Sequence, residues 1–361
     1  MPLKRASTSN ELTRDAPWKQ RPEGGSRFAI WLIRSIARYG GRPLARLCLY
    51  PITAYFLLVR GPERRASRAY LARVLDRAPG VWDVARHIHT FAATILDRVF
   101  LLSGQLSRFD IRVDGLEPLA RRVDRGEGVL VFGSHLGSFD SLRVLVTTRP
   151  SLRVRIVLDV SHNPAVTQLL DALNPRLAGD VIDAGQDGVA IVLAIQQALA
   201  DGELVALLVD RAAPGEAVTR VPFLGDDASF PNAPWLIAAT LRVPVVLAFG
   251  LYRGGNRYDL RFEEFSDGPD TLRQHASRKD RREAVAAVVA RYAARLQEQV
   301  RGAPYNWFNF YDFWDGDDAA DEKQARPGGS VGAATGTVAA GGHRDPEHHD
   351  PGQRDAVRGR P

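Results

Sequence analysis

A histidine and an aspartate five residues apart, His135 and Asp140, form the pair of side chains that most suggests chemistry. A hydroxyl is a poor nucleophile at neutral pH, and an imidazole that removes its proton makes it a better one. A carboxylate on one ring nitrogen fixes the tautomer that leaves the other nitrogen free to accept that proton. We therefore expect His135 to be a general base and Asp140 to orient its ring. The same spacing also arises by chance, so a structural pair is the alternative.

The residues around this pair predict where it lies. Residues 129–132 are apolar and β-branched, which is typical of a buried strand, and Gly133 and Gly137 punctuate the turn that follows. A helix is expected over residues 138–146. This places His135 at the carboxyl end of a strand, where open α/β sheets bind ligands.

Strand and helix patterns alternate through the rest of the chain. A long helix at 81–102 precedes them, and a strand at 258–265 and a helix at 283–300 end the series. Such alternation predicts an α/β fold with a mainly parallel central sheet flanked by helices. The alternating strands are expected at 129–132, 154–158, 204–209 and 243–249, and the helices at 138–146, 164–173, 189–200 and 233–241.

A second candidate group follows the strand at 204–209. Asp210 and Arg211 should lie on the same sheet edge as His135, and an arginine there suits binding of a substrate phosphate. An internal ion pair between the two is the alternative. The loop from Arg211 to Asn232 is long, and loops of that length are usually functional or disordered.

Three further residues in that loop are weaker candidates for substrate binding. Arg220 is a second possible phosphate ligand, and Phe223 and Gly225 belong to an apolar stretch that suits contact with an acyl chain. Ordinary packing of an apolar loop is equally compatible with it. The aromatic run at 305–314 suits a membrane interface, but we favour a structural role in the last element of the domain.

Four motifs in this order resemble the bacterial late acyltransferases of lipid A biosynthesis, within the glycerolipid acyltransferase superfamily. They span about residues 28–314: His135 to Asp140 resembles the His-x4-Asp signature, and the others are Asn163-Pro164, Asp210 with Val221 to Gly225, and Pro304 to Trp307. The resemblance implies a glycerolipid acyltransferase-like fold. It also implies transfer of a fatty acyl group from an acyl carrier protein or coenzyme A thioester to a hydroxyl of a lipid or glycolipid. No cofactor, metal or covalent intermediate is expected.

One departure bears on the acceptor. The family commonly carries an arginine just before the Asn-Pro, where this chain has Asp159-Val160-Ser161-His162. An acceptor other than lipid A is therefore one alternative. A non-enzymatic peripheral membrane protein, in which His135 is incidental, is the other.

Composition and charge predict the partners and the domain organisation. The net charge is +6 and nearly all basic residues are arginines, which suits anionic lipid headgroups or an acyl carrier protein rather than nucleic acid. The lone Cys48 excludes an internal disulfide. We expect a disordered basic arm at 1–27, membrane-associated apolar helices at 28–60, an acyltransferase domain at 61–315 and a disordered tail at 316–361.

The apolar helices and an arginine-rich segment at 60–77 together predict attachment to a membrane surface. The apolar runs at 28–33 and 47–59 are both shorter than the roughly 20 residues that a membrane span needs. Basic residues beside such runs are attracted to anionic lipid, although a solvated helix face has the same composition. The cytoplasmic face of the bacterial inner membrane is the expected location.

Overall fold

The computed structural model describes residues 41–142, 152–160, 180–213, 215–267 and 277–314, and the description below concerns these residues. They form a seven-stranded sheet in the order β1-β9-β8-β2-β5-β3-β4, together with a two-stranded hairpin, β6-β7. The strands are β1 (Asp110–Asp114), β2 (Val129–Gly133), β3 (Val154–Leu158), β4 (Val181–Asp183), β5 (Leu204–Leu208), β6 (Val218–Phe223), β7 (Asp226–Pro231), β8 (Val245–Gly254) and β9 (Arg257–Ser266).

The sheet is mainly parallel, as the sequence predicts. Strands β8, β2, β5, β3 and β4 run parallel to one another, and β9 pairs antiparallel with β8 before β1 joins it in parallel. All five residues of β2, at the centre, are buried. Leu130 and Phe132 point into the core beneath α10, α11 and α12, whereas Val129 and Val131 point into the core that includes Leu119 of α6.

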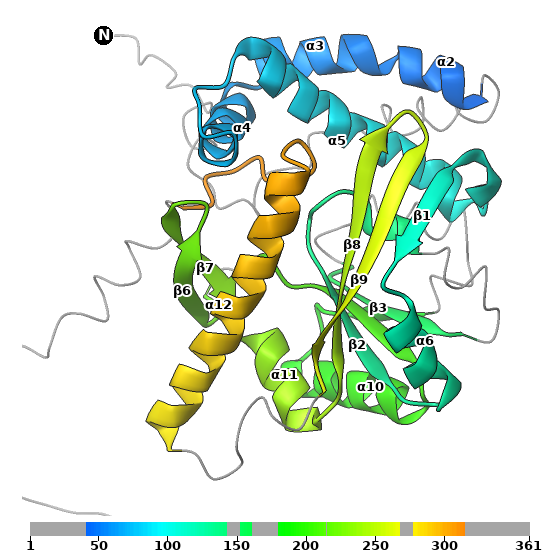
Figure 1. Ribbon diagram of the computed structural model, residues 1–361, viewed down its shortest axis with the longest axis vertical. Coiled ribbons are helices and arrows are strands. Elements are labelled where there is room, and N and C mark those ends of the chain that lie inside the picture. The colour runs from blue at the N-terminus through cyan, green and yellow to red at the C-terminus, as the bar shows by residue number, and fades with distance from the viewer. Residues whose placement is uncertain (1–40, 143–151, 161–179, 214, 268–276, 315–361) are drawn as a thin grey trace, which may run out of the picture. The chain divides into compact units, whose positions relative to one another are not determined.

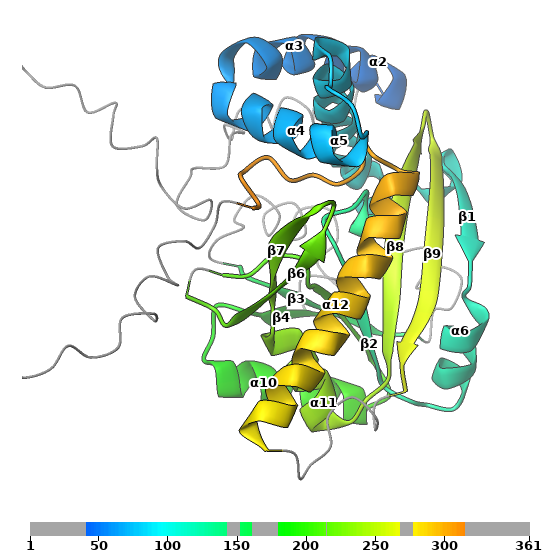
Figure 2. The ribbon, with the colours of Figure 1, turned by 60° about the vertical axis from the view of Figure 1, so that its left-hand side comes forward.

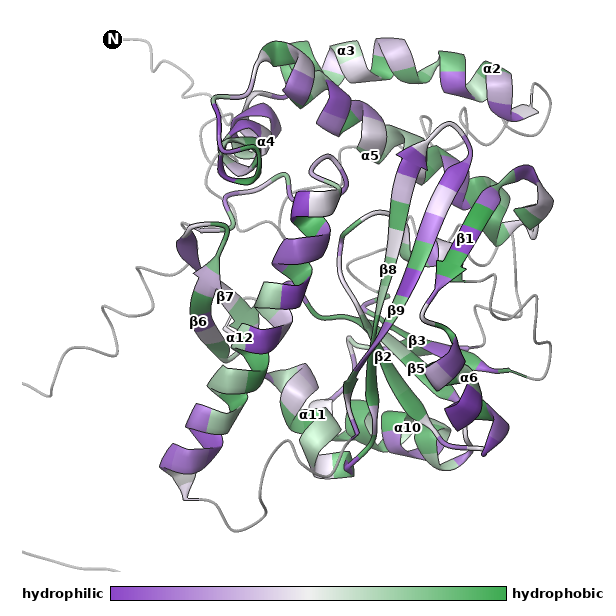
Figure 3. Ribbon diagram, viewed as in Figure 1, coloured by the Kyte–Doolittle hydropathy of each residue, from purple (hydrophilic) through white to green (hydrophobic). Residues whose placement is uncertain are grey.

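Helices cover both faces of this sheet (Figures 1 and 2). Figure 3 shows hydrophobic residues concentrated on the central strands, whereas α6 is largely hydrophilic. The helices are α2 (Gly41–Leu47), α3 (Leu49–Val59), α4 (Gly61–Val74), α5 (Val81–Leu102), α6 (Glu117–Asp124), α10 (Gly188–Ala200), α11 (Ala233–Leu241) and α12 (Arg278–Gly302), with 3-10 turns η2 (Leu106–Arg108) and η3 (Phe139–Leu142).

Two of the predicted segments differ from the structure, and β1, α6 and β4 were not predicted. The loop predicted between Arg211 and Asn232 contains the hairpin β6-β7, whose inward residues are buried and whose turn at Leu224 and Gly225 has positive φ angles of 53° and 95°. Pro222 and the polar residues of β7 hide the strand alternation from sequence reading. The helix predicted from residue 138 begins as the short turn η3, and its continuation and the helix predicted at 164–173 lie outside the described residues.

The N-terminal helices α2 and α3 lie along α5 (Figure 1). No single described helix is long and apolar enough to cross a bilayer, and the α2–α3 segment meets that test only together with α4, across a 94° bend. The arginine-rich segment is partly neutralised. Arg60 pairs with Glu63, Arg73 with Asp226 and Arg77 with Asp83.

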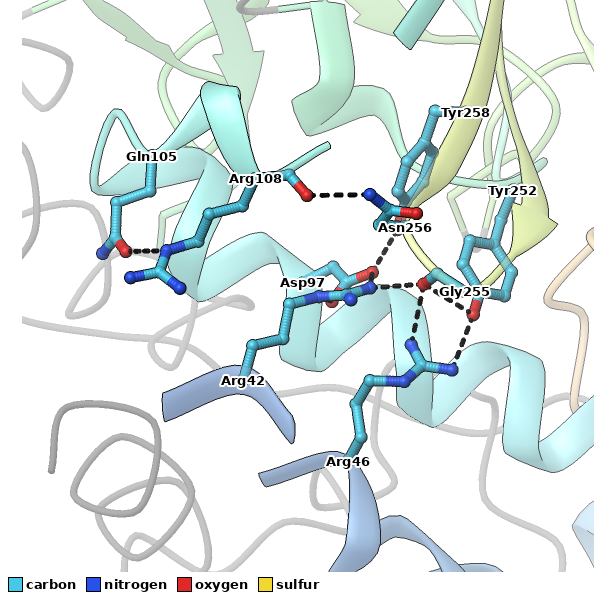
Figure 4. A network of polar contacts seen from close by, with 9 residues as sticks. All are labelled: Arg42, Arg46, Asp97, Gln105, Arg108, Tyr252, Gly255, Asn256 and Tyr258. Atoms are coloured by element: carbon cyan, nitrogen blue, oxygen red, sulfur yellow. Dashed lines mark hydrogen bonds and ion pairs between the residues drawn. The ribbon is translucent and has the colours of Figure 1, made fainter. Parts of the chain in front are cut away.

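A buried carboxylate fixes α2 to α5 and to the β8-β9 hairpin. Asp97 of α5 is fully buried and accepts hydrogen bonds from Arg42 Nε at 2.7 Å and Nη2 at 2.8 Å. Tyr258 of β9 donates its hydroxyl to Asp97 Oδ2 at 2.9 Å, and Arg42 also donates to the carbonyl of Gly255 (Figure 4). One side chain of α5 thus sets the position of α2.

We predict that Asp97→Ala lowers the free energy of unfolding by about 3–5 kcal/mol, because it leaves the nearly buried Arg42 without its counter-ion. Denaturant unfolding measures this loss. Glu283→Gln is the control, since its pairing with Lys279 joins two exposed side chains at 3.8 Å and should contribute little. An Asp97→Ala protein as stable as the Glu283→Gln protein would contradict the prediction.

Candidate active site

Strand register brings His135 and Asp210 together although 75 residues separate them. Strands β2 and β5 are hydrogen-bonded neighbours, and Gly133 pairs with Leu208 at their carboxyl ends. His135 and Asp210 each follow that pair by two residues. Two parallel strands that end in register therefore deliver both side chains to the same point of the sheet edge.

The geometry of this pair fixes the protonation of the imidazole. His135 Nδ1 lies 2.8 Å from Asp210 Oδ1, and the backbone N–H of His135 donates to Oδ2 at 3.0 Å. A carboxylate only accepts, so Nδ1 carries the proton and Nε2 presents its lone pair. The Asp210 side chain is fully buried, whereas that of His135 is 33% exposed. The arrangement has the form of a general base held by a buried carboxylate.

The prediction that Asp140 orients the ring of His135 is therefore wrong as to geometry, since Asp210 occupies Nδ1. Asp140 instead accepts a hydrogen bond at 2.6 Å from Nε of Arg98 on α5. The reason lies in the turn between them. Gly137 N donates to Asn306 O at 2.8 Å and Ser138 N to Gly250 O at 2.7 Å, which fixes the turn against β8 and the C-terminal segment before η3 begins.

Gly137 is required for this close approach. Its φ angle is +74°, and a Cβ atom at this position would lie 2.0 Å from the carbonyl oxygen of Gly250. Any other residue would push the turn away from β8. The glycine spacing in the sequence correctly predicts a turn here, and its purpose is to let two backbones touch.

The C-terminal segment completes the site, and sequence reasoning missed this role. Trp307 is fully buried and donates its indole N–H to Asp210 Oδ2 at 3.0 Å. Its backbone forms an antiparallel bridge with Leu136, and Phe308 N donates to His135 O at 2.9 Å. The Pro-x-x-Trp spacing was a signal for Trp307, but nothing in it named Asp210 as the partner.

Charge and burial keep the pair in the state that a base requires. Partial burial of the ring, followed by the positive charge of Arg211, lowers the pKa of His135, and Asp210 only partly opposes this. Burial would raise the pKa of Asp210, but the interactions with His135, Arg211 and Trp307 together hold it well below its usual value. At neutral pH the carboxylate is charged and the imidazole neutral.

Of the residues predicted to bind substrate, Arg211 lies next to the His135–Asp210 pair, whereas Arg220 and Gly225 lie on the β6-β7 hairpin. Arg211 lies beside the pair, donates to the carbonyl of Phe308 and stacks over the ring of Tyr311 at 5.4 Å. Arg220 is exposed on β6, and Gly225 forms the hairpin turn.

Of the two alternatives for the apolar stretch, ordinary packing holds for Phe223, and its predicted contact with an acyl chain is not supported. Phe223 has no exposed surface and packs against the ring of Trp307 at 5.2 Å, because the hairpin turns it into the core. The aromatic run at 305–314 has the structural role that the sequence favoured. His87 is likewise structural, bonded to Ser67 Oγ at 2.8 Å and to Trp307 O at 2.9 Å.

A protein-family model described as bacterial lipid A biosynthesis acyltransferase matches residues 87–315, more than half of the chain. The chain belongs to this family. The match begins within α5 and covers the whole sheet and the Trp307 segment, so His135, Asp210 and Trp307 all lie within it. No individual curated protein matches the sequence.

Membership of the lipid A acyltransferase family makes the chain an acyltransferase and implies transfer of an acyl group to an acceptor of the lipid A type. It also implies an acyl donor and a lipid acceptor as partners. The resemblance of the four sequence motifs is thereby confirmed at the level of the family.

Unpaired polar side chains occur in the turn around His135 and in the C-terminal segment that pairs with it. Within the described part of the chain, Ser134 Oγ, Ser138 Oγ and both amide atoms of Asn309 are buried and make no hydrogen bond. Ser134 and Ser138 flank His135 in the sequence. Asn309 directly follows Phe308, whose N–H donates to the carbonyl of His135. A buried polar group without a partner costs about 1–3 kcal/mol, so a site that retains several of them usually uses them.

We predict that His135 titrates below its unperturbed pKa of 6.5, and that Arg211→Gln raises its midpoint by removing a positive charge. Because the pKa of His135 is lower in the folded protein than in the unfolded chain, protonation favours unfolding. The stability contributed by neutral His135 is therefore present above pH 6.5 and lost as the pH falls below it. NMR titration of labelled histidine measures both midpoints. Arg220→Gln, on the exposed hairpin, is the control that should leave His135 unchanged. A midpoint that does not rise in Arg211→Gln would refute the electrostatic account.

Proposed function

We propose that the protein is an O-acyltransferase that moves a fatty acyl group from a thioester, on acyl carrier protein or coenzyme A, to a hydroxyl of a lipid A-type glycolipid. The observation that carries the proposal is the His135 imidazole, whose Nδ1 is held by the buried Asp210 carboxylate and whose side chain is partly exposed. A neutral base at the edge of a sheet is what deprotonation of a hydroxyl requires.

His135 Nε2 takes the proton of the acceptor hydroxyl as the oxygen attacks the thioester carbonyl carbon. The imidazolium that forms is stabilised by Asp210, which stays ionised. The tetrahedral intermediate then collapses, the carbon–sulfur bond breaks, and the leaving sulfur receives the proton from Nε2. An ester and a free thiol result, and no covalent enzyme intermediate forms.

The negative oxygen of the tetrahedral intermediate needs hydrogen-bond donors. The backbone N–H groups of His135, Gly137 and Ser138 already donate within the protein, so they are not available for this role. We propose the unpaired side chains of Ser134, Ser138 and Asn309 as donors instead. Because these atoms are buried, the role requires that substrate binding bring the thioester oxygen to them.

The proposed location is the cytoplasmic face of the bacterial inner membrane, where a lipid acceptor resides. The helices α2 and α3 support membrane attachment, because several of their large apolar side chains are exposed to solvent. Arg211 remains the candidate for an acceptor phosphate, since its charge lies next to the base. An acceptor other than lipid A is the alternative within the same chemistry.

We predict that His135→Ala and Asp210→Asn each lower acyl transfer by about 10²–10⁴-fold, the usual contribution of a general base. Purified protein with a labelled acyl thioester and a glycolipid acceptor provides the assay, with each donor class run in parallel. Asp140→Asn is the comparison, because Asp140 contacts Arg98 rather than His135 Nδ1. If Asp140→Asn lowers the rate of acyl transfer more than Asp210→Asn does, Asp140 rather than Asp210 supports His135.

We predict a different signature for Ser134→Ala and Ser138→Ala. Removing a buried hydroxyl that has no partner should leave the free energy of unfolding unchanged or higher, while loss of an oxyanion donor lowers kcat by about 10²–10³-fold. Denaturant unfolding and single-turnover kinetics measure the two effects. Unchanged kcat in both variants would exclude these hydroxyls as donors.

A further inference from the structure

A pocket of about 360 Å³ lies between α2, the beginning of α3 and α5, apart from the His135 site. Its lining residues are Arg42, Pro43, Arg46, Leu47, Tyr50 and His89. It borders α5 at His89. His87 and Arg98, which contact Trp307 and Asp140, mark the other side of the same helix. A ligand here therefore does not meet the catalytic base.

Arg46 gives this pocket a net positive charge. Its Nη1 donates to Gly255 O and its Nη2 to the Tyr252 hydroxyl, each at 3.0 Å (Figure 4). Both acceptors are neutral, so neither cancels the charge, whereas Asp97 offsets the charge of Arg42. The sequence of α2 and α3, residues 41–59, contains no aspartate or glutamate.

His89, which also lines the pocket, lies close enough to Arg46 for that charge to affect its pKa. His89 bonds through Nδ1 to Thr53 Oγ1 at 3.1 Å and packs against Tyr50, with ring centroids 5.1 Å apart. Partial burial and then the positive charge of Arg46 lower its pKa. Among the described residues, no acidic side chain pairs with Arg46, and its hydrogen-bond partners are the neutral Gly255 carbonyl and Tyr252 hydroxyl.

Two of the residues that line the pocket belong to an exposed apolar face. Leu44, Leu47, Tyr55 and Leu58 are 49%, 62%, 53% and 77% exposed and recur at helical spacing along α2 and α3. Tyr50, which lines the pocket, is 65% exposed and lies between them. Leu47 and Tyr50 thus belong both to the apolar face and to the wall around Arg46.

We propose that α2 and α3 lie on an anionic phospholipid bilayer through this face, and that the pocket receives the phosphate of a lipid headgroup against Arg46. The apolar rim argues for lipid as the source of the phosphate, because a free anion would gain nothing from exposed leucines. Guanidinium presents several donors to one phosphate. The inference deepens the membrane attachment proposed above and is independent of the acyl transfer chemistry.

The test is co-sedimentation of the full chain with phosphatidylcholine vesicles, with and without phosphatidylglycerol. Arg46→Gln should lower the affinity for vesicles that contain phosphatidylglycerol by about fivefold and leave the affinity for phosphatidylcholine vesicles unchanged. The fivefold loss corresponds to about 1 kcal/mol for one charge at an anionic surface. Arg46→Lys should retain most of it. The control is Arg121→Gln, which removes the same charge from the exposed face of α6 and should bind as the unchanged protein does. Unchanged thermal unfolding of Arg46→Gln establishes that α2 is still folded.

Two further arms separate the alternatives. Leu47→Ser with Leu58→Ser should reduce binding to both kinds of vesicle, and full binding by this variant would overturn the membrane attachment as well. If that variant detaches but Arg46→Gln still responds to phosphatidylglycerol, the headgroup site alone is wrong. Inorganic phosphate that stabilises the protein without vesicles, in an Arg46-dependent way, would mark a free-anion site and overturn the lipid assignment.

Discussion

The site depends on one buried carboxylate. Asp210 has no exposed surface and accepts hydrogen bonds from the ring and backbone of His135 and from the indole of Trp307. These donors, with the charge of Arg211 nearby, keep an otherwise costly buried charge ionised. Strand β5, the turn after β2 and the C-terminal segment all converge on these two oxygen atoms.

That convergence explains why the turn around His135 has little freedom. Its amides donate to Asp210, to the C-terminal segment and to β8, and Gly137 allows the backbones to touch. The ring is therefore aimed by backbone contacts as well as by its carboxylate. An imidazole held in this way has little conformational freedom left to lose when a ligand binds.

Helix α5 connects this site with the N-terminal helices. Through His87 and Arg98 it contacts the Trp307 segment and the turn that carries Asp140. Through Asp97 it holds Arg42 of α2 and Tyr258 of β9. One helix thus links α2 and α3, with their exposed apolar side chains, to the segments around His135.

The sequence by itself determined the α/β architecture, the central strands, the turn at His135 and the family. Apolar periodicity and glycine spacing are local signals, and they do not depend on which strands become neighbours. The tertiary structure decided which carboxylate serves His135. Asp140 was nearer along the chain, but the order of strands places β5 beside β2, and equal offsets from Gly133 and Leu208 select Asp210. The hairpin that buries Phe223 and the contact of Trp307 with Asp210 likewise depend on pairings between segments far apart in the chain, which no local pattern encodes.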